Sequence, residues 1–148
     1  MELEIKVKSM EQEDLVDFLS TALYDNGNYR TEYNVGCYNS VCKVDEEDCF
    51  EEKCAKVLLA GGDISFADML SEDSSCKYGD NPNAFWSEQA RAVIYPIKYD
   101  DIIKGLNKAV EEGYASEVLA LADKDADFDA LEADCLLQFI LFGEVVYG

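Results

Sequence analysis

Residues 91–113 read RAVIYPIKYDDIIKGLNKAVEEG, and this stretch decides the fold class because its apolar period changes half-way along. Residues 91–97 are rich in β-branched and aromatic side chains, which predicts a strand, and Pro96 places the end of that strand at a sheet edge or a terminus. From Asp100 to Gly113 apolar residues return every three or four positions, which predicts a helix closed by Gly113. A strand followed at once by an amphipathic helix indicates that both elements belong to one fold.

On the N-terminal side of this stretch, strand-like and helix-like segments alternate. Short segments in which apolar and polar residues alternate, or in which tyrosine, threonine and valine gather, favour strands. Longer segments with apolar residues on one helical face, and with acids in the first turn, favour helices. We expect strands over residues 3–7, 29–38 and 64–69, helices over 11–25 and 45–60, and a loop over 71–83.

The C-terminal third is expected to be helical. A short helix over residues 116–122 precedes Asp129 and Glu132, which form a capping-box pattern for a last helix that reaches about Leu141. Gly143 follows that helix and is expected to end it. The whole pattern predicts an α+β fold, with a small, mostly antiparallel sheet packed against helices and a helical C-terminal third.

The chain is long enough for one domain with a hydrophobic core: it has 148 residues, of which 49% are hydrophobic. No linker or change of composition divides residues 1–148, so we expect a single domain. Residues 1–8 lack the apolar segment of a signal peptide, and the apolar stretch 136–146 is too short to cross a bilayer. We therefore expect a cytoplasmic protein with no membrane partner.

The net charge is extreme, because 32 acidic residues face 12 basic ones and give a formal charge of −20. Such a charge opposes direct binding to nucleic acid or to an anionic membrane, and it attracts a basic protein surface by electrostatic steering. The alternative is that the acidity serves solubility only, or a salt-rich habitat. The oligomeric state does not follow from the charge.

Acidic residues gather on three predicted segments. Residues three or four apart on a helix are separated by about 4.5–6 Å along its axis, and phosphates on one DNA strand by about 3.4 Å. Rows of carboxylates can therefore occupy a basic groove built for a phosphate backbone. The candidate partner-binding residues are Glu11, Asp14 and Asp17; Glu47, Asp48, Glu51 and Glu52; and Asp123, Asp125 and Asp127.

The sequence favours a protein that is not an enzyme. It contains no histidine, which is the commonest general base, and no phosphate-binding loop, nucleophile elbow or zinc-protease motif. Paired carboxylates can hydrolyse glycosides, but among 32 acids some pairs are close by chance. We expect no cofactor.

Four of the six cysteines, Cys37, Cys42, Cys49 and Cys54, are spaced C-x4-C-x6-C-x4-C. Four thiolates can hold zinc, but structural zinc sites use shorter spacings. Cys54 also lies on the apolar face of its predicted helix, where a small buried side chain is expected. We expect free thiols and no metal at these positions.

Aspartates alternate from Asp123 to Asp129, as at positions 1, 3, 5 and 7 of a calcium-binding EF-hand loop. Position 6, which requires glycine, is Phe128, and position 12, which requires a bidentate glutamate, is Asp134. An acidic loop that caps a helix fits this segment better than a calcium site.

Residues 127–148, DFDALEADCLLQFILFGEVVYG, combine a helix with Phe-Gly-Glu and a short apolar-aromatic end. This stretch resembles the end of small acidic proteins encoded by phages and prophages of Gram-positive bacteria, and the helix that begins at Tyr99 is similar in style. The resemblance covers the last third of the chain and includes no catalytic motif. Because such proteins include inhibitors of CRISPR nucleases and of restriction enzymes, it implies an anti-defence protein.

Together these features predict a phage-type anti-defence inhibitor, anti-CRISPR-like or anti-restriction-like. Its partner would be the basic nucleic-acid-binding surface of a host defence enzyme, such as a CRISPR nuclease, which it would bind as an acidic mimic of DNA or RNA. The alternative is a protein-interaction or assembly module of phage origin that is neither a mimic nor a catalyst.

Overall fold

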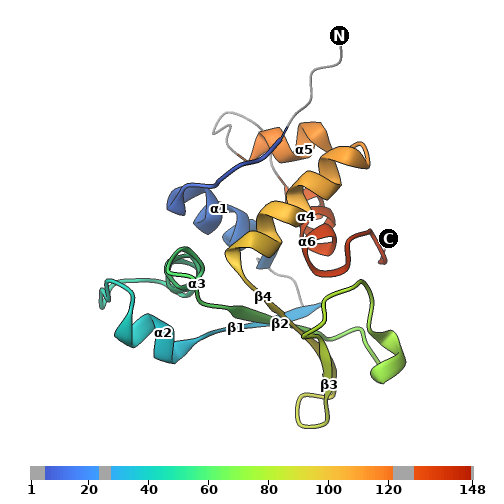
Figure 1. Ribbon diagram of the computed structural model, residues 1–148, viewed down its shortest axis with the longest axis horizontal. Coiled ribbons are helices and arrows are strands. Elements are labelled where there is room, and N and C mark those ends of the chain that lie inside the picture. Colours follow the sequence, from blue (N-terminus) through green and yellow to red (C-terminus); the bar gives the residue numbers. More distant parts are fainter. Residues whose placement is uncertain (1–5, 24–27, 122–128, 148) are drawn as a thin grey trace.

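The computed structural model describes residues 6–23, 28–121 and 129–147. A four-stranded antiparallel sheet packs against helices, and the C-terminal third is helical, which confirms the predicted α+β class (Figure 1). Among these residues, no helix is both long enough and apolar enough to cross a membrane.

The sheet has the strand order β1-β2-β4-β3, and every neighbouring pair is antiparallel. Phe66 lies opposite Tyr95 at its centre, and both side chains are fully buried. Burial of one such side chain stabilises a fold by about 1.5–3 kcal/mol. The strands are β1 (Tyr29–Tyr33), β2 (Ile64–Asp68), β3 (Phe85–Ser87) and β4 (Ala92–Ile97).

The helices gather on one side of the sheet, with α2 at one end of the long axis (Figure 1). In the resulting helical layer α1 packs against both α3 and α6, while α4 and α5 pack against α6. Because α6 is enclosed by these neighbours, it is apolar nearly all round. The helices are α1 (Gln12–Leu23), α2 (Val35–Ser40), α3 (Phe50–Leu59), α4 (Tyr99–Glu111), α5 (Ala115–Ala120) and α6 (Ala130–Phe142), with a 3₁₀ turn over Ser74–Cys76.

The ends of several elements follow the predicted signals. Asp129 caps α6 by accepting a hydrogen bond from the Glu132 N–H, and Gly143 ends that helix with a φ of 76°. Pro96 lies next to the end of β4, beyond the last residue paired with β3. Its carbonyl instead accepts a hydrogen bond from the Asn81 amide at 2.8 Å.

The strand expected over residues 29–38 is wrong in its second half, which forms α2. The Asn34 side chain accepts a hydrogen bond from the Cys37 N–H at 3.0 Å and so starts a helix directly after β1. The helix expected over 45–60 begins only at Phe50, because residues 45–49 form a loop whose Asp48 is held by Tyr38 and Lys56. The short strand β3 was not predicted, and it forms by pairing with β4.

The strand expected over residues 3–7 lies mostly outside the described residues, and residues 6–10 have no regular secondary structure. The Val7 N–H donates to the Asn107 Oδ1 at 2.7 Å, and the Asn107 Nδ2 donates to the Val7 carbonyl at 2.9 Å. A side-chain amide of α4 thus satisfies the backbone groups that a neighbouring strand would otherwise bind.

Candidate protein-interaction surface

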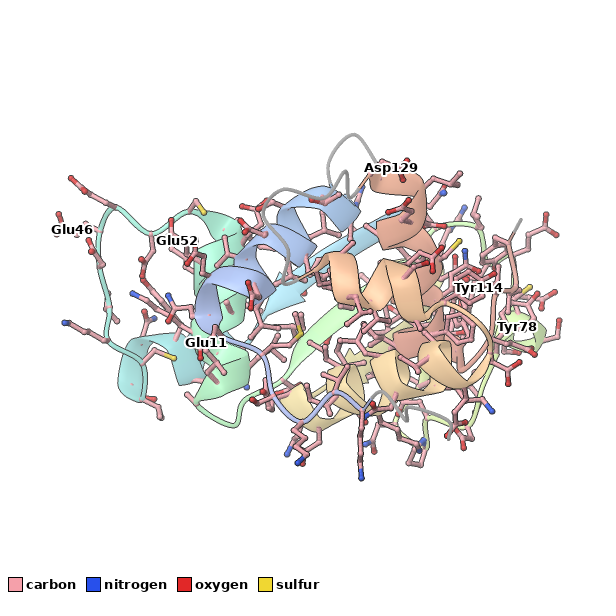
Figure 2. The ribbon with its side chains drawn as sticks, turned by 90° about the horizontal axis from the view of Figure 1, so that it is seen from above. Glu11, Glu46, Glu52, Tyr78, Tyr114 and Asp129 are labelled. Atoms are coloured by element: carbon pink, nitrogen blue, oxygen red, sulfur yellow. The ribbon has the colours of Figure 1, made fainter. Side chains whose placement is uncertain are left out.

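A protruding segment at one end of the long axis contains α2, the loop 41–49 and the first turn of α3. We call residues 34–53 the tip. Figure 2 shows Glu46 of this loop at the far end of the molecule. The tip combines acidic and apolar side chains that are exposed to solvent.

Three side chains hold the loop of the tip in place. The Lys56 Nζ lies 2.6 Å from the Asp48 Oδ2 and also donates to the Lys43 carbonyl at 2.8 Å. The Tyr38 hydroxyl donates to the same Asp48 oxygen at 2.7 Å. Because Tyr38 comes from α2 and Lys56 from α3, these contacts fix the loop against both helices.

The electrostatics of this cluster keep Asp48 ionised. Hydrogen bonds from Lys56 and Tyr38 lower the pKa of the Asp48 carboxyl, and the hydrogen bond to Asp48 raises the pKa of Lys56. The pKa of Tyr38 is raised, first by burial and then by its hydrogen bond to Asp48. The Asp48 side chain is only 4% exposed, so this candidate partner-binding residue already has two partners within the chain.

The other candidate acids of the tip remain accessible. Glu47 is exposed in the loop, and Glu51 and Glu52 are half-buried at the start of α3. One oxygen of Glu52 accepts a hydrogen bond from the Cys49 N–H at 3.2 Å and so helps to cap the helix. Acids at this position are also favoured by the helix dipole.

The second acidic cluster, Glu11, Asp14 and Asp17, lies at and near the start of α1, which packs against α3 of the tip. Glu11 and Asp17 are exposed and Asp14 is half-buried, while Leu15 and Phe18 face the core. Because α1 packs directly against α3, two clusters that are about thirty residues apart in the sequence lie on neighbouring helices. In Figure 2, Glu11, Glu46 and Glu52 all lie in the half of the molecule that carries the tip.

The third predicted cluster, Asp123, Asp125 and Asp127, lies outside the described residues, and so does most of the predicted acidic loop. Asp129 caps α6 and lies in the other half of the molecule (Figure 2).

Exposed apolar side chains at the tip were not predicted as site residues. Val41 is 63% exposed, Val35 55% and Val44 52%. Beside them the ring of Tyr33 contacts those of Tyr38 and Phe50 edge to face. A sequence signal was present, since Val41 and Val44 are apolar residues outside any helical or strand period. The tip thus has the composition of a protein interface, with apolar and aromatic groups beside charged ones.

The four spaced cysteines do not converge. All six cysteines carry free thiols, and Cys54 is buried on the apolar face of α3, as predicted, where burial raises its pKa to about 12. Cys49 is exposed at the start of the same helix, while Cys37 lies within α2 and Cys42 directly after its C-cap Val41. Within the described residues, no three potential metal-ligating side chains are grouped as a metal site would require.

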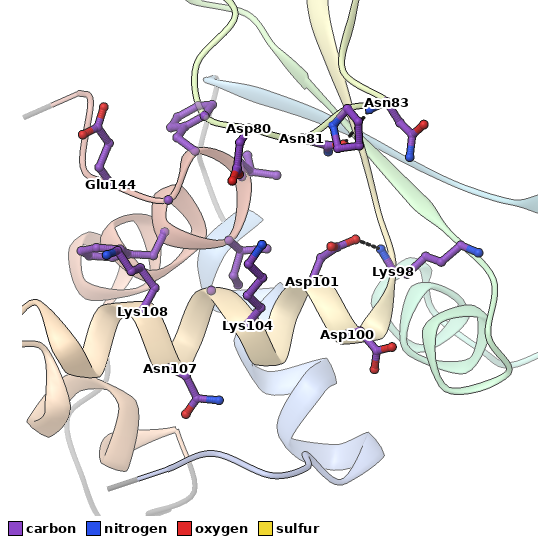
Figure 3. A pocket seen from close by; sticks show the side chains of 18 of the residues that line it. Asp80, Asn81, Asn83, Lys98, Asp100, Asp101, Lys104, Asn107, Lys108 and Glu144 are labelled. Carbon is purple, nitrogen blue, oxygen red and sulfur yellow. Dashed lines mark hydrogen bonds between the residues drawn. The ribbon is translucent and has the colours of Figure 1, made fainter. Parts of the chain in front are cut away.

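A separate groove of about 1090 Å³ lies between α4, the C-terminal end of α6 and the loop 79–83 (Figure 3). Lys104 and Lys108 point toward it from α4, and Asp80 lies on the opposite wall. Lys108 pairs with Glu111 and Glu112, and Asp101 accepts a hydrogen bond from the Lys98 N–H. The groove therefore mixes both charges, and several of its charged groups already have structural partners.

No protein-family model matches this sequence, and comparisons with curated proteins and with solved structures return no match.

Proposed function

We propose that this protein binds the basic, nucleic-acid-binding surface of another protein and inhibits it by occupying the place of DNA or RNA. The observation that most directly supports the proposal is the packing of α1 against α3. This packing places α1, with Glu11, Asp14 and Asp17 at and near its start, next to the helix that carries Glu51 and Glu52 of the tip.

A large net charge and acidic residues on adjacent helices act together in such an interaction. The formal charge of −20 steers the chain toward a basic partner, and carboxylates on adjacent helices then meet several lysines or arginines at once. Each exposed ion pair contributes only about 0–1 kcal/mol, so affinity is spread over many carboxylates. Asp48 is excluded from this set, because its carboxylate is held by Lys56 and Tyr38.

The biological setting in this proposal is an infected bacterium. The resemblance of residues 127–148 to the ends of small acidic phage proteins suggests an anti-defence role. The partner class would then be a restriction enzyme or an RNA-guided nuclease, which both have basic nucleic-acid channels.

A second candidate function is a phage assembly or interaction module that does not imitate nucleic acid. The exposed valines of the tip favour it, because Val35, Val41 and Val44 would be buried in an apolar contact. The two candidates differ in salt dependence, since an acidic mimic loses affinity steeply with salt whereas an apolar contact does not.

The test is the affinity of the protein for a partner captured from a host lysate. We expect binding to fall with added salt, to compete with nucleic acid, and to weaken at least tenfold when Glu47, Glu51 and Glu52 are changed together to glutamine. The matched control changes Glu111, Glu112 and Glu144 to glutamine, which alters the net charge equally on exposed positions outside the tip. Two outcomes would contradict mimicry by this surface. One is binding that neither competes with nucleic acid nor weakens with added salt, and the other is binding that weakens equally in both variants.

A further inference from the structure

The end of α2 brings two cysteines together. The Val41 N–H donates to the Cys37 carbonyl at 2.9 Å, and the Cys42 N–H donates to the same carbonyl at 3.3 Å. A bond from residue i+5 back to the carbonyl of residue i is typical of helix ends, and it holds those two residues next to each other. Disulfides require close backbones of this kind, with Cα atoms about 4.4–6.8 Å apart.

The side chains of the two residues also meet. Burial, and then the neighbouring Cys37 thiol, raise the pKa of Cys42, and both residues are half-buried, so a small oxidant reaches them. A Cβ atom at Gly62 would lie only 2.6 Å from the Cys37 Sγ. Gly62 therefore provides the space in which the Cys37 thiol is packed.

The remaining cysteines are placed differently. Cys54 is fully buried, and its pKa of about 12 leaves almost no reactive thiolate, which makes a bond to the nearby Cys49 unfavourable. Cys76 lies in the 3₁₀ turn and Cys135 on α6, on separate elements. Oxidation is therefore directed to one pair.

We propose that Cys37 and Cys42 form a thiol–disulfide modification site, which a low-molecular-weight disulfide such as oxidised glutathione converts into one intramolecular disulfide. One thiolate of the pair attacks a glutathione sulfur, forms a mixed disulfide and releases one glutathione. The second thiolate then attacks the protein sulfur of that mixed disulfide and releases the other glutathione. Two protein thiols are oxidised, one glutathione disulfide is reduced, and the two protons pass to the released glutathiones.

The bond would act on the tip, and this part of the inference rests on the proposed function. It ties the end of α2 to the start of the loop that carries Val41 and Val44, and Lys43 of that loop already binds Lys56 through its carbonyl. A surface held in one conformation loses less entropy on binding. We expect the oxidised protein to dissociate from its partner several-fold more slowly than the reduced protein.

Disulfide formation between Cys37 and Cys42 is tested without any partner protein. The full chain is incubated with oxidised glutathione, the remaining thiols are alkylated, and the protein is analysed by mass spectrometry. We expect a species that has lost two hydrogen atoms, with four alkylated cysteines. Cleavage after Tyr38 should give two linked peptides, one with each cysteine of the pair, and dithiothreitol should restore both thiols.

Single cysteine-to-serine variants identify which two cysteines form the disulfide. Cys37→Ser or Cys42→Ser should retain one glutathione and form no internal bond, whereas the half-buried controls Cys76→Ser and Cys135→Ser should react as the unmodified chain does. The pKa of Cys42 is raised by burial and by the neighbouring Cys37, so the rate should increase from pH 7 to pH 9. Absence of the linked peptides in the unmodified chain, or equal linkage among other cysteines, would overturn the proposal. A disulfide that forms but leaves partner dissociation unchanged would refute only its effect on the tip.

Discussion

Asp48 differs from its acidic neighbours at the tip, because its carboxylate holds the loop 41–49 to Lys56 and Tyr38. Gln138 has a comparable role in the interior. Its amide nitrogen donates to the Asp134 carboxylate and to the Tyr147 carbonyl, and its oxygen accepts from the Val146 and Tyr147 N–H groups. A buried amide with every group satisfied anchors the C-terminal residues against α6.

The first prediction concerns the pH dependence of the Asp48 contact. Because its pKa is lower in the folded protein, Asp48 stabilises the loop above its unfolded pKa of about 3.8 and loses this effect as the pH falls through the folded value. The pKa of Lys56 is raised above its usual 10.5 by the hydrogen bond to Asp48. The contact therefore keeps its full effect up to about pH 10.5, and it is lost only as the pH rises through the higher pKa of the folded protein. Asp48→Asn should therefore speed amide hydrogen exchange in residues 41–49 several-fold at pH 7, and should change little once the pH is well below 3.8.

The matched control for this prediction is Glu46→Gln, which removes an exposed charge from the same loop and should leave exchange unchanged. If Asp48→Asn exchanged as slowly as the unmodified protein at pH 7, the loop would not depend on this carboxylate.

At the scale of elements, the contact between α4 and α6 depends on one glycine. Gly105 lies so close to α6 that an added Cβ would be 2.5 Å from the Ile140 Cα and 2.8 Å from its backbone nitrogen. Backbone atoms cannot give way as a flexible side chain would. A glycine inside a helix, normally unfavourable by about 1 kcal/mol relative to alanine, here permits the close packing of the two helices.

The second prediction follows from this contact. Gly105→Ala should lower the free energy of unfolding by about 1–3 kcal/mol, because overpacking outweighs the gain in helix propensity. Chemical denaturation measures the change. Gly36→Ala on α2 is the matched control, since its Cβ would have no contact closer than 3.4 Å and should be neutral or stabilising by up to about 1 kcal/mol. Equal changes in the free energy of unfolding for the two substitutions would show that α4 and α6 can move apart without destabilising the protein.

At the scale of the whole molecule, the charge that supports the proposed function also opposes folding. A compact chain with a formal charge of −20 repels itself, and the ion pairs described among its residues are few, with Lys56–Asp48 the best buried of them. Salt screens repulsion between exposed charges, with a Debye length of about 30 Å at 0.01 M and about 3 Å at 1 M.

The third prediction is that sodium chloride stabilises the protein. Between about 0.01 M and 0.5 M we expect a gain of about 1 kcal/mol, which raises the melting temperature by about 2–4 °C in a chain of this size. The variant with Glu47, Glu51 and Glu52 changed to glutamine should gain less, because it repels itself less. A melting temperature that falls with salt would mean that ion pairs outweigh the repulsion. Partner binding should have the opposite salt dependence.

Local signals in the sequence determined α1, α4 and α6 and the strands β2 and β4, because apolar period, capping residues and terminal glycines act within a few residues. They also determined the α+β class, the acidic character and the burial of Cys54.

Tertiary structure alone decided the order of the strands, the pairing that creates β3 and the change from strand to helix after Asn34. It also decided which acids are available, because Lys56 and Tyr38 reach Asp48 only when α2 and α3 have packed together. Tertiary packing also brings α1 next to α3. This approach depends on core contacts between residues far apart in the chain, and a local sequence pattern does not encode such contacts.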